Sequence, residues 1–170
     1  MPDVFTSTRI RRAGLADLDP LAPLFDAYRR FYGQPADLAR ARAFLQARLS
    51  GGESVVFVAE ATQTPVDARG APLPGASPAT ALTGFCQLYP TWCSVEAARI
   101  FVLYDLFVTE RARRGQVGAH LMMAAQVHAR EAGAVRIDLS TAHTNTGAQA
   151  LYESLGWKRD QAFRTYSLAL

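Results

Sequence analysis

The feature that most constrains this chain is an abrupt change of hydrophobic period between residues 98 and 139. Residues 98–108 are a run of strand-forming apolar residues, whereas at 115–132 leucine, methionine and alanine recur at helical spacing. Residues 135–139, where apolar and charged residues alternate, are typical of a further short strand. A strand, a helix and a strand in this order predict a parallel pair of strands joined by a crossover helix.

The remaining elements follow from the same reading of hydrophobic period and turn residues. In chain order they are a strand at 9–12, helices at 18–28 and 38–49, strands at 55–60 and 81–89, a helix at 144–155 and a closing pair of short strands within 157–170. Proline and glycine are dense at 62–80, which predicts an exposed hairpin loop and not a domain boundary. We therefore expect one domain over 1–170 of mixed α/β (α+β) class, with a mixed central sheet and helices on both faces.

Size and composition argue against several classes of protein. With 170 residues, 49% apolar and 19% charged, the chain has the composition of an ordinary globular domain. Its apolar runs are far shorter than the ~20 residues that span a bilayer, and its start lacks the pattern of a signal peptide. The expectation is a cytoplasmic protein without a membrane partner.

The charge pattern and the two cysteines argue against nucleic acid and metal ions as partners. The formal net charge is +3, but the arginines are scattered among acids, so we expect no nucleic-acid partner. Cys86 and Cys93 have no further Cys or His pair at metal-ligand spacing. They are expected to be reduced thiols, and no metal site is expected.

The turn that follows the strand at 98–108 has the chemistry of an anion site. Arg113, Arg114 and Gly115 stand directly before the helix, and Gly118 lies in its first turn. The first amides of a helix lack internal partners and carry the positive end of the helix dipole, which suits a diphosphate. On these residues alone, an ordinary loop with two solvated arginines explains the turn equally well. The three-glycine dinucleotide fingerprint and the triphosphate-binding Gly-Lys-Ser/Thr are both absent.

A second group of residues lies on the helix predicted at 144–155. Asn145 and Tyr152 are seven residues apart, so they share one side of the helix at a separation of roughly 10 Å. An amide and a phenol so placed could flank an elongated ligand. Taken alone, a capping asparagine and a half-buried tyrosine are the simpler explanation.

Together and in this order, the two segments resemble the GNAT family of N-acetyltransferases. The family's acetyl-CoA signature, Arg/Gln-x-x-Gly-x-Gly/Ala, corresponds to residues 113–118, with Gln116 in place of the first signature glycine. The later segment, 145–157, matches the family pattern Asn-x-x-Ala-x-x-Leu-Tyr-x-x-x-Gly-Phe/Trp. The strand 103–108 is similar to its counterpart in the small-amine acetyltransferases of the family. The likeness covers nearly the whole chain.

The resemblance implies a GNAT-like, mostly antiparallel sheet with a splayed parallel strand pair. It also implies direct transfer of an acetyl group from acetyl-CoA to a primary amine of a small molecule, with both substrates bound together. Backbone groups at Leu106, Phe107 and Val108 would bind the pantetheine arm, and one of their amides would stabilise a developing oxyanion. The other implied cofactor contacts are Arg113, Arg114, Gly115, Gln116, Val117, Gly118, Asn145 and Tyr152.

Tyr152 is the candidate general acid, because a phenol with a pKa near 10 can protonate a departing thiolate. Asp105 is the candidate base, directly or through water, although alternation along the strand could turn it toward the core. His143 is a second candidate base, for which a surface-loop histidine is the simpler explanation. Polyamine acetyltransferases of the family carry a glutamate where this chain has Tyr104, which argues against a polyamine substrate.

Aromatic side chains are predicted to form the wall of the acceptor site, because their faces hold cationic amines. The candidates are Tyr28, Phe31, Tyr32, Tyr89 and Trp92. Plain core or dimer contacts explain them equally well. No cluster of acids marks a polycationic substrate, so a small amine or an amino-acid-like molecule is expected. Acetylation of protein N-termini or lysines, and a non-catalytic acyl-CoA-binding module, remain as alternatives. A homodimer is an expectation of the resemblance.

Overall fold

The structure, a computed structural model, describes residues 5–63 and 79–170 and divides into two compact units, Met1–Leu139 and Ser140–Leu170. The first unit contains, in chain order, β1 (Phe5–Arg12), η1 (Leu15–Asp17), α1 (Leu18–Phe31), α2 (Leu38–Ser50), β2 (Val55–Gln63), β3 (Ala79–Cys93), β4 (Ala98–Val108), η2 (Glu110–Ala112), α3 (Val117–Glu131) and β5 (Ile137–Asp138). The second unit contains α4 (Thr146–Ser154). None of the helices in the described part of the chain has the length and apolar composition needed to cross a bilayer.

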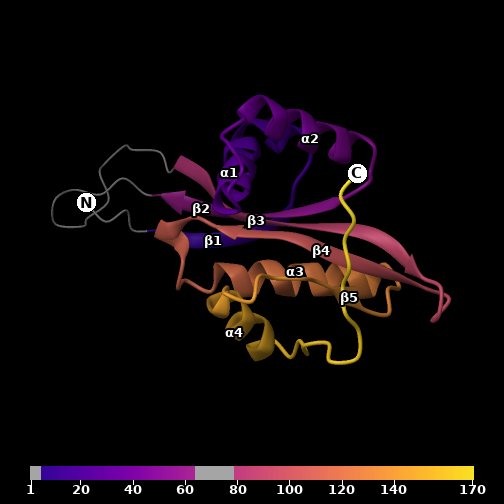
Figure 1. The fold of residues 1–170 in the computed structure, drawn as a ribbon. Helices are drawn as coiled ribbons and strands as arrows, with labels where there is room; N and C mark the ends of the chain where they lie inside the picture. Colours follow the sequence, from indigo (N-terminus) through magenta and orange to yellow (C-terminus); the bar gives the residue numbers. More distant parts are fainter. Residues whose placement is uncertain (1–4, 64–78) are drawn as a thin grey trace. The chain divides into compact units, whose positions relative to one another are not determined.

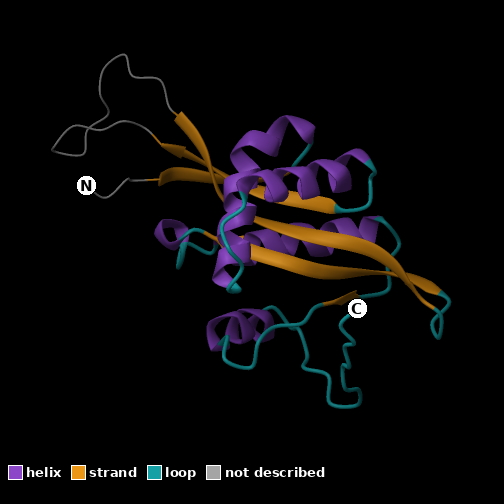
Figure 2. Cartoon of the chain, turned by 45° about the horizontal axis from the view of Figure 1, so that its top comes forward, coloured by secondary structure: helices purple, strands orange, loops and turns teal. Residues whose placement is uncertain are grey.

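The first unit is built on one five-stranded sheet in the order β1-β2-β3-β4-β5. All neighbours are antiparallel except β4 and β5, which are parallel. Helices α1 and α2 cover one face, α3 covers the other, and the tip of the β3–β4 hairpin extends beyond them (Figures 1 and 2). The β4–β5 ladder ends at Val102↔Asp138, while β4 continues to Val108. The predicted mixed sheet, with helices on both faces and a splayed parallel pair, is confirmed.

Strand β3 lies at the centre of the core and is buried on both faces. Burial is continuous from Thr83 to Leu88, which is typical of a strand covered by helices on either side. Phe85 packs with the apolar faces of α1 and α2, in a cluster that includes Leu21, Ala22, Phe25, Ala41, Leu45, Val56 and Val58. Cys86 faces the other way, and its Sγ donates to the carbonyl of Leu121 on α3 at 3.5 Å. Phe85 therefore faces α1 and α2, whereas Cys86 faces α3.

Strand β4 contains one residue more than β3 at the centre of the sheet. Gln87 pairs with Asp105, but the next residue, Leu88, pairs with Leu103. Tyr104 is therefore the extra residue of a β-bulge. A bulge of this kind changes which face of the sheet the following side chains occupy.

The bulge decides the direction of Asp105. On its N-terminal side, Phe101 packs against His128 of α3, with ring centroids 5.4 Å apart. Strict alternation would turn Asp105, four residues later, toward α3 as well. Because of the extra residue, Asp105 instead lies on the face covered by α1, where Tyr28 forms a hydrogen bond with it.

The turn from η2 into α3 places its unusual backbone angles on residues other than glycine. Positive φ occurs at Arg114 (67°) and at Gln116 (61°), and Gly115 is not among the residues with positive φ. The left-handed angles of this turn therefore fall on Arg114 and Gln116, and not on Gly115 between them. Gln116 is the N-cap of α3, and the left-handed conformation falls on this position, where the family signature has glycine. A side chain in this conformation costs roughly 1–2 kcal/mol.

The boundaries of several predicted elements differ from the structure. β1, β2 and β3 extend beyond the predicted ranges, and β2 and β3 pair as the predicted hairpin. Most of the loop predicted at 62–80 falls on residues 64–78, which lie outside the described residues. β5 has only two residues, Ile137 and Asp138, because its ladder with β4 ends there.

The predicted pair of strands within 157–170 is wrong. Tyr166, Leu168 and Leu170 alternate as in a strand, but no strand is formed in this described segment. The side chain of Asp160 accepts hydrogen bonds from the amides of Ala162 and Phe163, which bends the chain in the middle of the predicted pair. Alternation alone does not make a strand, since each strand needs a neighbouring backbone to pair with.

Gln116→Gly should raise the free energy of unfolding by up to about 1 kcal/mol in urea denaturation. Relief of the left-handed strain, roughly 1–2 kcal/mol, outweighs the extra entropy of glycine in the unfolded chain, roughly 0.5–1 kcal/mol. The matched control is Gln46→Gly, on the exposed side of α2, which should lose about 1 kcal/mol. Equal losses at both positions would contradict the strained conformation of Gln116.

Candidate active site

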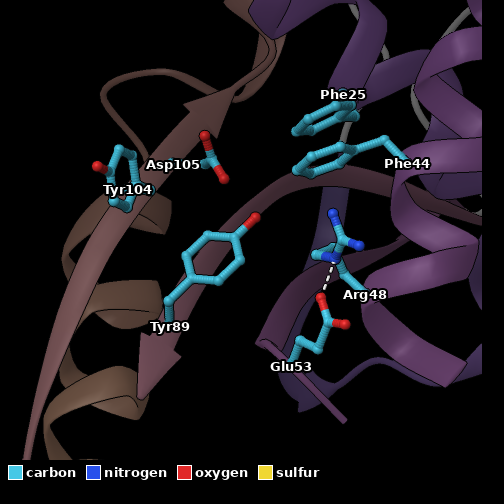
Figure 3. Close-up of a pocket in the computed structure, with 7 residues that line it drawn as sticks. All are labelled: Phe25, Phe44, Arg48, Glu53, Tyr89, Tyr104 and Asp105. Atoms are coloured by element: carbon cyan, nitrogen blue, oxygen red, sulfur yellow. Dashed lines mark ion pairs between the residues drawn. The ribbon is translucent and has the colours of Figure 1, made fainter. Parts of the chain in front are cut away.

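A pocket of about 380 Å³ lies beside the β4 bulge, between the sheet and the helices α1 and α2. Its lining side chains are Phe25, Phe44, Arg48, Glu53, Tyr89, Tyr104 and Asp105. Figure 3 shows Tyr104 and Asp105 on one side of the pocket, Arg48 and Glu53 on the other, and Tyr89 between them. The pocket thus combines three charged groups with four aromatic rings, at a size suited to a small molecule.

Asp105 is the buried titratable group of the pocket, with 6% of its surface exposed. Burial raises the pKa of its carboxyl group to about 6, because the charged form loses solvation, and the hydrogen bond from Tyr28 lowers it in part. The single proton of the Tyr28 hydroxyl is shared between Asp105 and the carbonyl oxygen of Tyr104, the bulge residue, which lies 3.1 Å from the hydroxyl. Tyr28 therefore ties α1 to the bulge. A carboxyl group with this pKa is ionised at neutral pH and can accept a proton.

Gln87, opposite Asp105 on β3, is fully buried and is hydrogen-bonded to the pocket residue Tyr89. Its side-chain nitrogen donates to the hydroxyls of Ser54 and Tyr89, each at 2.8 Å. Burial, and then the nearby charge of Asp105, raise the pKa of the Tyr89 phenol. Tyr89 therefore stays protonated throughout the physiological range.

The opposite wall of the pocket comes from the two N-terminal helices. The rings of Phe25 and Phe44 stack with centroids 5.3 Å apart and planes within 6°. The guanidinium of Arg48 lies over the Phe44 ring, 5.1 Å from its centroid, and its Nε forms an ion pair with Glu53. This wall therefore consists of two stacked rings, with the Arg48–Glu53 ion pair at its edge.

The residues predicted for the acceptor wall lie in different places. Tyr89 lines the pocket, and Tyr28 contacts Asp105 and the backbone of the bulge. Phe31 and Tyr32, at the end of α1, are 58% and 49% exposed and do not line this pocket. Trp92 is 68% exposed near the tip of the β3–β4 hairpin, with Arg99 over its ring.

Five lining residues were missed by sequence reasoning. Phe25 was assigned only to an apolar helix stripe, and Tyr104 only to a comparison with polyamine enzymes. Phe44, Arg48 and Glu53 gave no signal of their own. The one available hint was the placement of charged residues on both sides of the Gly51-Gly52 helix stop, at the end of a helix predicted to cover the sheet.

The predicted cofactor contacts of the first unit cluster at the end of β4 and the start of α3. Leu106, Phe107 and Val108 are half-buried and lie beyond the last β4–β5 pair. The side chain of Arg113 donates from Nε to the carbonyl of Val108 at 3.1 Å, which fastens the turn to the strand.

The start of α3 fits an anionic group. The backbone amide of His120 donates to the carbonyl oxygen of Gln116 at 3.0 Å, the first hydrogen bond of the helical ladder. The amides of Val117, Gly118 and Ala119 therefore precede this ladder. Arg114, exposed beside them, adds positive charge. First-turn amides and a nearby arginine suit a diphosphate such as that of acetyl-CoA. Among residues 5–63 and 79–170, no group of three or more His, Cys, Asp or Glu side chains is placed to hold a metal.

The other predicted cofactor and catalytic residues belong to the second unit. Asn145 is the N-cap residue of α4, but its side chain donates to Thr141 Oγ1 at 3.3 Å and does not cap the helix. Tyr152 is half-buried on α4, with its ring centroid 6.2 Å from that of Trp157. His143 is exposed before the helix.

Comparison with known proteins places the chain in one family. The profile of the Acetyltransferase (GNAT) family matches residues 21–157. The uncharacterized N-acetyltransferase YhfO of Bacillus subtilis (strain 168) is 41% identical over 159 residues, which cover 94% of this chain and 95% of that protein. A probable acetyltransferase of Haemophilus influenzae (strain Rd) is 30% identical over 156 residues, or 91% and 92% of the two chains.

Solved structures agree with the sequence comparison. The crystal structure of a probable acetyltransferase superimposes with a TM-score of 0.79 at 40% identity, covering 95% of this chain and 97% of that one. The chain therefore belongs to the GNAT family and is an acetyltransferase, of a family whose members take the acetyl group from acetyl-CoA.

Proposed function

We propose that the protein transfers the acetyl group of acetyl-CoA directly to a primary amine of a small molecule bound in the pocket beside Asp105. The observation that carries this proposal is a buried carboxyl group, with a pKa of about 6, lining a pocket of about 380 Å³. An alkylammonium has a pKa near 10 and must lose a proton before it attacks. Asp105 accepts that proton, and the size of the pocket is within the range of small-molecule sites.

The residues at the end of β4 and the start of α3 hold the co-substrate. Acetyl-CoA, when bound, supplies a thioester carbonyl that the amine attacks. The backbone of Leu106 to Val108, free of β5, binds the pantetheine arm, and Asn145 contacts it. The amides of Val117 and Gly118, with Arg113 to Gln116, bind the diphosphate through hydrogen bonds and charge. Support for this assignment comes from the helix-start geometry and the family signature.

Tyr152 protonates the departing sulfur. A thiol has a pKa near 8.5 and a phenol near 10, so a phenol held within hydrogen-bond reach can donate a proton as the thiolate leaves. The assignment is supported by the match of residues 145–157 to the family pattern. Starting from the alkylammonium, the nitrogen loses two protons and the sulfur gains one. Asp105 takes the first proton before the attack, and the second, lost from the nitrogen as the amide forms, replaces the proton that Tyr152 gives to the sulfur.

Asp105→Asn should lower kcat by about a hundredfold or more, because a positioned base contributes roughly 10²–10⁴. The assay is release of the CoA thiol with a panel of primary amines. Wild-type kcat/KM should fall on acidification with a midpoint near pH 6, where Asp105 becomes protonated, and the variant should lack this midpoint. A variant with the wild-type rate and pH profile would show that Asp105 is not the base.

Stability measurements on Asp105→Asn separate a lost base from a damaged fold. Because burial raises the pKa of Asp105 above its unfolded value, the native state binds the proton more tightly. The stability that this adds is present at low pH and is lost as the pH rises from about 4 to about 6. Relative to wild type, Asp105→Asn should therefore be more stable at about pH 8 than at about pH 4.

Tyr152→Phe should lower kcat by about a hundredfold with little change in the affinity for acetyl-CoA, since only the proton donor is removed. Steady-state thiol release gives kcat, and equilibrium titration gives the affinity. Tyr166→Phe is the matched control, because Tyr166 is 86% exposed in the same unit. An unchanged kcat in Tyr152→Phe would rule out the acid role.

A further inference from the structure

We propose that the acceptor carries a carboxylate as well as its amine, and that Arg48 selects it. The acceptor class is then that of amino acids in the broad sense, with the amine at Asp105 and the carboxylate at Arg48. This inference rests on the proposed function, because it names the substrate class of the same pocket.

Arg48 is held in a defined orientation at the edge of the pocket. Its guanidinium lies over the ring of Phe44, 5.1 Å from the centroid, and the Nε edge forms the ion pair with Glu53. Within the described part of the chain, neither terminal nitrogen of Arg48 donates a hydrogen bond to another residue. With Nε in the ion pair, the guanidinium still presents its two terminal nitrogens, whose planar geometry matches the two oxygens of a carboxylate.

Arg48 is placed so that its terminal nitrogens can bind an anion in the pocket. With 29% of its side chain exposed, Arg48 is shielded from solvent more than a surface cation, so an ion pair there is less weakened by water. The pocket separates it from Asp105, with Tyr89 between (Figure 3). Asp105, Arg48 and Tyr89 line one pocket of about 380 Å³, which is the size of a small-molecule site. One small molecule can therefore meet both.

The charges of the pocket favour a carboxylate over a second amine. Glu53 is the other acidic group, but its carboxylate is already paired with Arg48. A diamine would place a second cation beside the guanidinium. A carboxylate instead completes a three-membered network in which Arg48 lies between two anions, an arrangement that the five donors of arginine allow.

Matched acceptor pairs test the proposal. We would measure kcat/KM by thiol release for 4-aminobutyrate against butylamine, β-alanine against propylamine, and phenylalanine against phenethylamine. In the wild type, at least one carboxylate-bearing acceptor should exceed its partner by about tenfold or more, which corresponds to about 1.4 kcal/mol. A ratio near one for every pair, or a preference for the plain amines, would overturn the proposal.

Variants assign the selectivity to Arg48. Arg48→Met keeps an unbranched apolar stem over Phe44 and should bring the ratio close to one, whereas Arg48→Lys keeps the charge without the planar pair of donors and should give an intermediate ratio. Arg42→Met, on the same helix with its ion pair to Asp19, should keep the wild-type ratio. Similar melting temperatures for Arg48→Met and Arg42→Met would show that the fold is retained. An unchanged ratio in Arg48→Met would overturn the assignment.

A binding measurement separates this proposal from the proposed function. We would titrate 3-phenylpropionate and its uncharged amide calorimetrically into the protein saturated with CoA. Neither ligand carries an amine that could be acetylated. The carboxylate should bind the wild type more tightly, and Arg48→Met should lose this difference. Carboxylate selectivity without turnover of any amine would keep the role of Arg48 and reject acetyl transfer to small amines. Turnover without carboxylate selectivity would keep acetyl transfer to small amines and reject the role of Arg48. If neither turnover nor carboxylate selectivity is seen, both proposals are rejected.

Discussion

The pairing of Gln87 with Asp105, one step past the bulge at Tyr104, sets the direction of the carboxyl group on which the proposed chemistry depends. Without the extra residue, Asp105 would point toward α3 with Phe101, into an apolar layer. With it, Asp105 meets Tyr28 and the pocket beneath α1 and α2. Burial of the carboxylate costs free energy, which the hydrogen bond from Tyr28 offsets in part, and this cost raises the pKa to about 6. Burial of the Asp105 carboxylate therefore both lowers the stability of the fold and raises the affinity of Asp105 for a proton.

The rest of the first unit holds this arrangement in place. Gln87, in a strand that is buried on both faces, donates hydrogen bonds to Ser54 and to the pocket residue Tyr89, which fixes the Tyr89 hydroxyl. The stacked rings of Phe25 and Phe44 close the other side, and Arg48 lies over Phe44 where the proposed carboxylate would bind. The β4–β5 ladder ends at Val102, before the bulge, which frees the backbone that the proposal assigns to acetyl-CoA.

Periodicity and turn chemistry predicted most of the fold, and the family motifs predicted where the co-substrate binds. The direction of Asp105 could not be predicted, because a bulge arises from the pairing of two strands and leaves no mark in the alternation of one. Arg48 and Glu53 were missed for a related reason: their role depends on how α2 packs over the sheet. The strands expected within 157–170 failed because apolar alternation does not provide a pairing partner. At Gln116 the departure from the family signature was visible, but not that the glutamine itself adopts the left-handed conformation.

The most direct test of the central claim is thermal unfolding with and without acetyl-CoA, because it asks whether a chain with Gln116 at the signature position still binds the co-substrate. A ligand at 100 times its dissociation constant stabilises a protein by about 2.7 kcal/mol. For a chain of this size, that predicts a rise in melting temperature of roughly 5–10 °C. Acetyl-pantetheine, which lacks the diphosphate, should give a clearly smaller rise at the same concentration. No rise at millimolar acetyl-CoA would contradict the account, since neither the anion site at α3 nor the acetyl transfer would then stand.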